Sequence, residues 1–161
     1  MQKITTCLWF DDNAEEAVDF YVSAFPNSEI MDVARYTEEA SKAAGQPAGS
    51  VMTIAFELEG REFVALNGGP QFTFSPAISL VANCTTQDEV DRLWETLSRG
   101  GGTHQCGWLH DRFGVSWQIV PVRLIELLRH QDPAKARRVM QAMLQMGKLD
   151  IARLEQAAAL E

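Results

Sequence analysis

The sequence has few residues that could cross-link the chain or anchor it in a membrane. Its three cysteines, Cys7, Cys84 and Cys106, are odd in number and show no CxxC spacing, which argues against a disulfide framework or a zinc knuckle. No apolar run approaches the roughly 20 residues needed to span a bilayer. The segment from Met1 to Phe10 also lacks the basic start and long apolar centre of a signal peptide. These absences predict a cytoplasmic protein with reduced thiols.

Positive charge is scarce as well. The chain has 14 Lys and Arg residues against 22 Asp and Glu residues, for a formal net charge of −8. Nucleic acids and anionic membranes repel such a chain, so we expect neither as a partner. A hydrophobic share of 46% over 161 residues is ordinary for a soluble protein of one domain or two small modules.

The sequence does contain an internal repeat. In each half, a strand pattern is followed by a helix-start signal and an apolar stripe at helical spacing. At an offset of 74, Thr5 pairs with Ser79, Phe10 with Cys84, Asp12 with Thr86 and Glu15 with Glu89; the last two pairs have the spacing of a capping box. We therefore predict an α+β protein in which two βαβββ modules, residues 1–76 and 77–121, form a curved mixed sheet that encloses a cleft.

Three further strands are expected in the first half, at Glu29 to Tyr36, Val51 to Leu58 and Arg61 to Leu66. Glu59-Gly60 is the turn between the last two. The segment Thr37 to Ser50 is rich in small and polar residues, so we predict a mobile loop that could hold one short helical turn but buries little.

The second half ends in a predicted β-hairpin over Gln105 to Pro121. Asp111 to Gly114 supplies its turn, where we expect His110 and Asp111 to be solvated. Residues 122–156 are predicted to form a helical extension that docks on its own domain or on a second subunit. The last five residues, 157–161 (AAALE), look like a cloning-vector remnant.

The repeat, the hairpin phrase QCGWLHDRFGVSWQIVP and the segment Met146 to Ala152 (MGKLDIA) together resemble one protein family. It is the PhnB-like branch of the glyoxalase/bleomycin-resistance (vicinal oxygen chelate) superfamily, whose members are often labelled 3-demethylubiquinone-9 3-methyltransferase-like. The resemblance extends from Ile4 to about Gln156, and Trp117 to Pro121 is its most specific part.

The resemblance implies a homodimer with a pocket in each concave sheet. In metal-using relatives, four strand positions present His, Glu or Gln to a divalent ion. These positions correspond here to Thr5, Asn67 or a neighbour, Ser79 and Gln118. Hydroxyls and amides are poor substitutes for imidazole and carboxylate as ligands. We therefore expect no metal and no cofactor.

The expected ligand pocket combines these positions with nearby strand residues. Trp9 and Trp117 are the preferred aromatic candidates, although a core or interface position is an equal alternative for each. Trp94, on a helical stripe, is expected in the core. The full set of pocket candidates is Thr5, Cys7, Trp9, Asn67, Ser79, Trp117 and Gln118.

Other chemistry-bearing residues leave alternatives open, and no catalytic residue is assigned. His104 and Cys106 share strand parity with Trp108 and His110 and could hold a metal, but partly exposed strand residues are the preferred interpretation. Glu57 could serve as an acid or base in the cleft, against the alternative of a solvated outer face.

Three functional hypotheses follow. The first is metal-independent binding of a small apolar or aromatic molecule in the cleft. The second is a divalent-metal-dependent lyase, isomerase or dioxygenase. The third is a quinone-pathway methyltransferase, for which the sequence lacks a Gly-rich nucleotide loop between a strand and a helix. Whether the protein is an enzyme is left open.

Overall fold

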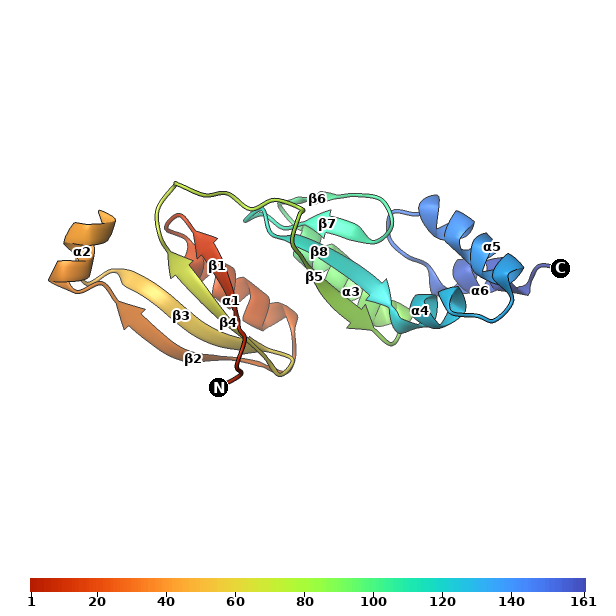
Figure 1. Cartoon of the computed structure of the whole chain (residues 1–161), viewed down its shortest axis with the longest axis horizontal. Coiled ribbons are helices and arrows are strands. Elements are labelled where there is room, and N and C mark those ends of the chain that lie inside the picture. The colour runs from red at the N-terminus through yellow and green to blue at the C-terminus, as the bar shows by residue number, and fades with distance from the viewer. The chain divides into compact units, whose positions relative to one another are not determined.

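The computed structural model describes residues 1–161 and divides the chain into two compact units, Met1–Phe74 and Ser75–Glu161. Each unit contains one βαβββ module, and the second also carries three C-terminal helices (Figure 1). The α+β class and the two βαβββ modules are therefore as predicted. None of the six helices combines the length and apolarity that a bilayer crossing requires.

The first unit is a four-stranded mixed sheet in the order β1-β4-β3-β2, with β1 parallel to β4 and the other pairs antiparallel. Helix α1 covers one of its faces (Figure 1). The elements are β1 (Thr6–Phe10), α1 (Ala14–Ala24), β2 (Ser28–Arg35), α2 (Glu38–Ala44), β3 (Val51–Leu58) and β4 (Arg61–Asn67).

Helix α1 forms where the apolar stripe predicts it, and the stripe is buried. Its Tyr21 ring stacks on Phe56 of β3, with the ring centroids 6.5 Å apart. The predicted capping box of Asp12 and Glu15 is wrong: the N-cap is Asn13, which makes no side-chain cap bond. The first helical N–H, that of Ala14, instead donates to Asn67 Oδ1 at 2.9 Å. A residue at the end of β4 therefore satisfies a group that a local cap usually satisfies.

The predicted loop from Thr37 to Ser50 contains a helix. Thr37 caps α2 by accepting a hydrogen bond from the Ala40 N–H at 3.2 Å, and Gly45 ends the helix in the left-handed conformation. These are ordinary start and stop signals. The expectation that this segment buries little is correct, because α2 has no buried residue.

The second unit repeats the arrangement, with sheet order β5-β8-β7-β6 and helix α3 against one face (Figure 1). Thr86 caps α3 as predicted, although the Glu89 carboxylate accepts from the N–H of Thr85 rather than of Thr86. Trp94 is half-buried on α3 and is not one of the fully buried core side chains, so its predicted core position is wrong. The elements are β5 (Ser79–Cys84), α3 (Gln87–Ser98), β6 (Gly102–Thr103), β7 (Trp108–His110) and β8 (Ser116–Pro121).

The predicted hairpin is present as β7 and β8, but Asp111 in its turn is buried rather than solvated. Asp111 Oδ1 accepts hydrogen bonds from the N–H groups of Phe113 (2.9 Å) and Val115 (3.0 Å). Its Oδ2 accepts from Trp117 Nε1 at 2.9 Å. The carboxylate thus links both sides of the turn and fixes the Trp117 indole.

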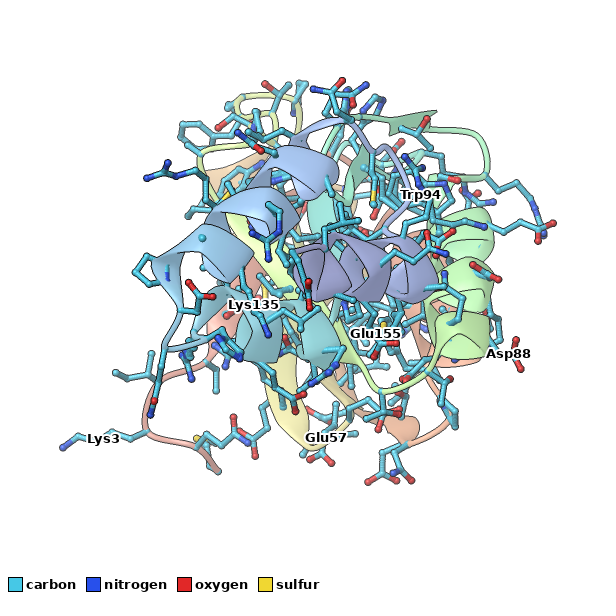
Figure 2. All side chains as sticks on the ribbon, turned by 90° about the vertical axis from the view of Figure 1, so that its right-hand side faces the viewer. Lys3, Glu57, Asp88, Trp94, Lys135 and Glu155 are labelled. Carbon is cyan, nitrogen blue, oxygen red and sulfur yellow. The ribbon has the colours of Figure 1, made fainter.

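The C-terminal extension consists of α4 (Val122–Leu128), α5 (Pro133–Leu144) and α6 (Ile151–Ala159). Figure 2 looks onto these helices and labels Glu155 on α6. They share a small core of Leu124, Leu127, Val139, Met146, Leu149 and Leu154. The first three residues of the predicted vector remnant, 157–159, form the end of α6, and Arg138 donates to the carbonyls of Ala157 and Ala158. Structurally this segment is part of the extension, whatever its origin.

The segment between α5 and α6 holds the extension against the second module. The N–H groups of Cys106 and Gly107 donate to the carbonyls of Met146 (2.8 Å) and Gly147 (2.9 Å). We call this four-residue contact the latch. The first two carbonyl groups of the MGKLDIA segment thus extend the hydrogen bonding of the second module.

Helix α3 makes a second attachment to the same segment. Gln87 bonds to the backbone of Leu149 and Ile151, and Lys148 Nζ lies 2.9 Å from an oxygen of Asp91. A hydrogen bond from Gln87 and the charge of Lys148 lower the pKa of the Asp91 carboxyl below its ordinary value.

Candidate functional site

Each sheet has one face covered by its helix and one open face. Strand register shows which side chains share a face, because residues paired across strands point to the same side. The open face of the first sheet carries Cys7, Trp9, Asp32, Thr53, Ala55, Glu57, Glu62, Val64 and Leu66. The open face of the second sheet carries Ser79, Val81, His104, Trp108, His110, Ser116 and Gln118.

The middle of the open face of the first sheet carries mainly small and apolar side chains. Val64 pairs with Cys7 on one side and with Ala55 on the other. Cys7 is exposed, whereas Val64 and Ala55 are half-buried. These side chains form an apolar surface suited to a flat group, and the carboxylates of Asp32, Glu57 and Glu62 border it on the same face.

Trp9 borders this surface and is held by the loop after β4. Its Nε1 donates to the Gly69 carbonyl at 2.9 Å, and its ring meets Phe72 edge-on at a centroid distance of 4.9 Å. A Cβ at Gly68 would lie 2.3 Å from the indole, so only glycine allows the ring this position. Gly68 and Gly69 therefore position Trp9, which is a predicted pocket residue.

Asn67 itself is buried and serves the fold. Besides capping α1, its Nδ2 donates to the Val51 carbonyl at 3.1 Å, and its own carbonyl accepts from the Tyr36 hydroxyl at 2.5 Å. The register also gives a different repeat partner for Gln118. Cys7 pairs with Val64 as Val81 pairs with Gln118, and Cys7 and Val81 are 74 residues apart. Val64, not Asn67, thus occupies the equivalent position.

On the second sheet, the predicted pocket residues Ser79 and Gln118 do meet: Gln118 Nε2 donates to Ser79 Oγ at 2.9 Å. Trp108 pairs with Gln118 and shares its face, and it is half-buried. Trp117 points the opposite way, into the core, and is 3% exposed. Trp108 therefore replaces Trp117 as the aromatic residue on this surface, a result that side-chain alternation along β8 already implies.

Two histidines also lie on this open face, where the imidazoles of His104 and His110 approach to 2.7 Å between Nε2 and Nδ1. The prediction that His104 and Cys106 point to the same side of one strand is wrong. Cys106 has a φ of 61° in the turn before β7, and its N–H is held by the latch. No three His, Cys, Asp or Glu side chains are placed so that they could hold one metal ion.

The four positions used for metal in the superfamily do not suit a divalent ion in this chain. Thr5 is exposed just before β1, and Val64 offers no donor atom. Ser79 and Gln118 are bonded to each other. Hydroxyl and amide groups without a carboxylate or imidazole form a weak donor set for a transition metal.

Glu57 lies on β3, paired with Glu62 of β4 and Glu29 of β2 (Figure 2 labels Glu57). It borders an open hollow of about 530 Å³ that is also lined by Glu29, Glu59, Ser28, Pro26, Asn27 and Gly60. Three partly solvated carboxylates side by side repel anions and offer no positive partner, so this hollow carries no distinct chemistry.

Cys84 can be set aside as a nucleophile. It is fully buried, and burial, together with the nearby Glu89 carboxylate, raises the pKa of its thiol to about 12, against a lowering by Arg92. The thiol therefore stays protonated at neutral pH, whereas a nucleophile or metal ligand must be a thiolate.

Paired βαβββ modules with a helix behind each sheet and an open face opposite define a protein of the glyoxalase/vicinal oxygen chelate superfold. Within it, the family described as 3-demethylubiquinone-9 3-methyltransferase matches residues 2–120. The chain belongs to this family, the PhnB-like branch of the superfamily, as its sequence resemblance implies. No protein with a curated description matches the chain.

Solved structures agree with this assignment. The PhnB protein of Bacillus cereus, which carries the same family description, is 38% identical over 74% of this chain and 99% of its own, with a TM-score of 0.66. PA1353 of Pseudomonas aeruginosa is 20% identical over 75% of this chain and 98% of its own, with a TM-score of 0.60, and shows the same fold. FosX of Listeria monocytogenes, solved with Mn(II), is 13% identical over 74% of this chain and 93% of its own, and its TM-score of 0.51 also concerns the fold alone.

The family match ends at residue 120, short of the extent to about Gln156 that the resemblance predicted. Helices α4, α5 and α6 thus lie beyond the matched part. The Met146 and Gly147 carbonyls of the latch, and the Leu149 and Ile151 groups that bond to Gln87, also lie beyond it.

Proposed function

We propose that the protein binds a small, flat, apolar or aromatic molecule on the open faces of its sheets, without a metal at the four superfamily positions. The observation that carries this proposal is the composition of these faces. On the first sheet, half-buried Trp9 shares a face with Val64. On the second sheet, half-buried Trp108 shares a face with Ser79 and Gln118. Val64, Ser79 and Gln118 stand where metal-using relatives place charged or imidazole ligands. Indole rings offer large, rigid surfaces for stacking, and a few neutral hydrogen-bonding groups orient a ligand.

The test is ligand discovery followed by two matched variants. Native mass spectrometry of the purified chain is expected to reveal a retained organic molecule, and elemental analysis is expected to find no stoichiometric metal that depends on Gln118. Trp108→Leu should weaken binding of that molecule, or of a hit from an aromatic library, at least tenfold by calorimetry. Trp94→Leu is the control, because Trp94 is half-buried on α3, the helix that covers the opposite face of the second sheet.

Two outcomes would replace the proposal. Stoichiometric metal that is lost in Gln118→Ala would establish the divalent-metal enzyme. Tight binding of S-adenosylmethionine would favour methyl transfer, the activity that the family description names. Both glycine runs that could have formed a nucleotide loop have other roles: Gly100 follows α3 with a φ of 79°, and Gly68 and Gly69 position Trp9.

We also propose that the protein works as a homodimer, as the family resemblance implies. The same native mass spectrum checks this directly, because a mass of twice 17.9 kDa is expected. A monomer at micromolar concentration would contradict it.

A further inference from the structure

The histidine pair on the second sheet has a fixed member and an adjustable member. His110 lies on β7 opposite Gly102, and a Cβ at Gly102 would lie 2.5 Å from His110 Cε1. The ring therefore packs directly on the glycine backbone. His104 follows β6, and its N–H donates to the Trp108 carbonyl at 2.8 Å, so its backbone is anchored while its side chain is exposed.

The contact between the rings brings two nitrogen atoms close to the separation that a shared metal ion requires. His104 Nε2 and His110 Nδ1 are 2.7 Å apart, and the ring planes are inclined at 33°. In such a bond one nitrogen donates and the other accepts, so a lone pair points from one ring towards the other. An ion about 2.05 Å from each nitrogen in tetrahedral geometry needs a nitrogen separation of roughly 3.3 Å. Turning the exposed His104 ring by a small angle provides this.

We propose that His104 Nε2 and His110 Nδ1 bind one divalent transition-metal ion, with water in its remaining coordination positions. Two imidazoles select Cu²⁺, Ni²⁺ and Zn²⁺ over Mg²⁺ and Ca²⁺, which prefer oxygen ligands. The bound ion lies on the same open face as Trp108 and Gln118, and it is separate from the four superfamily positions. This site goes beyond the proposed function, which needs no metal.

Calorimetric titration of the full chain, without an affinity tag, tests the site. NiCl₂ is the probe, since Ni²⁺ does not oxidise the free thiols. We expect one ion per chain, and at least tenfold weaker binding in His104→Gln and in His110→Gln. The chain has only three histidines, so His130→Gln is the matched control. His130 accepts a hydrogen bond from the Asp132 N–H at the end of α4, and its loss should leave the affinity unchanged.

Paramagnetic broadening in the unmodified protein gives a second measurement that no folding defect can disturb. Bound Ni²⁺ should broaden the amide signals of residues 102–104 and 108–110 before any others. Parent-like affinity in both single variants, or first broadening elsewhere, would overturn the site. If only Gln118→Ala abolishes Ni²⁺ binding, both the histidine site and the proposed function are overturned. If only the His104 and His110 variants lose Ni²⁺ binding, the proposed function is unaffected.

Discussion

At the scale of single residues, Asp111 determines the geometry of the hairpin. It accepts hydrogen bonds from three N–H groups in a position that is 1% exposed. Asp111→Ala leaves these donors without a partner, and hydrogen bonds to a charged group contribute about 1.5–3 kcal/mol each. We expect a loss of about 3–5 kcal/mol in the free energy of unfolding, measured by urea denaturation.

Asp111→Asn separates the shape of the side chain from its charge. The amide oxygen can still accept from Phe113 and Val115, but its NH₂ group then faces the Trp117 N–H. A smaller loss, about 1–3 kcal/mol, is expected. Asp19→Asn on the exposed side of α1 is the control and should change stability by less than about 0.5 kcal/mol. Equal effects of Asp111→Ala and Asp19→Asn would refute the structural role.

Residue-scale predictions from sequence succeeded where alternation along a strand was applied and failed where it was not. Gln118 and Trp117 are neighbours in one strand, so both cannot face one pocket, and the structure places only Gln118 on the open face. The roles of Asp111 and Asn67 come from partners that fold close to them, up to 53 residues away for Asn67. Turn chemistry alone does not reveal that such a residue is buried.

At the scale of elements, the latch depends on Gly107. Its φ is 82°, and a Cβ there would lie 2.8 Å from the Ile119 carbonyl oxygen and 2.9 Å from Leu149 Cδ1. Gly107→Ala should therefore lower the free energy of unfolding of the second unit by about 2–4 kcal/mol, the sum of backbone strain and steric overlap. Hydrogen exchange should show loss of protection first at the amides of Cys106 and Gly107.

Gly49 provides a matched control for this substitution. Its φ is 83°, almost identical to that of Gly107, but a Cβ there would meet nothing within 4 Å. Gly49→Ala should show the backbone strain alone, about 1 kcal/mol. If both substitutions cost the same, close packing at Gly107 contributes nothing and the latch is not a tight contact.

Elements with strong local signals were predicted within one or two residues. Strands β3 and β4 and their Glu59-Gly60 turn illustrate this, because both turn residues adopt the positive φ that such a hairpin requires. Helix α2 was predicted as no more than one short turn, because its seven residues bury nothing and no apolar stripe marks it. The latch was missed because backbone groups make it, and these leave little trace in a sequence.

At the scale of the whole molecule, the internal repeat was the most informative signal. It led to the fold and the family, because two similar halves with the same order of strand and helix patterns define few architectures. It did not lead to the chemistry. The repeat positions that bind metal in relatives carry Thr5, Val64, Ser79 and Gln118 here, and the first half of the chain has no histidine to match His104 and His110.

The helical extension supports a final prediction about the molecule as a whole. The match to the relative from Bacillus cereus covers 74% of this chain and 99% of the relative, and the family match stops at residue 120. A chain ending at Pro121 should therefore still fold into its two modules. It should melt several degrees lower, because removal of residues 122–161 exposes Val120 and leaves the Cys106 and Gly107 N–H groups without their carbonyl partners. Circular dichroism melting of the two chains measures this, and nuclear magnetic resonance spectra of the shortened chain should keep dispersed signals for the first unit. A shortened chain that is wholly unfolded would show that the extension is part of the core, whereas an unchanged melting temperature would show that the latch stabilises only the extension itself.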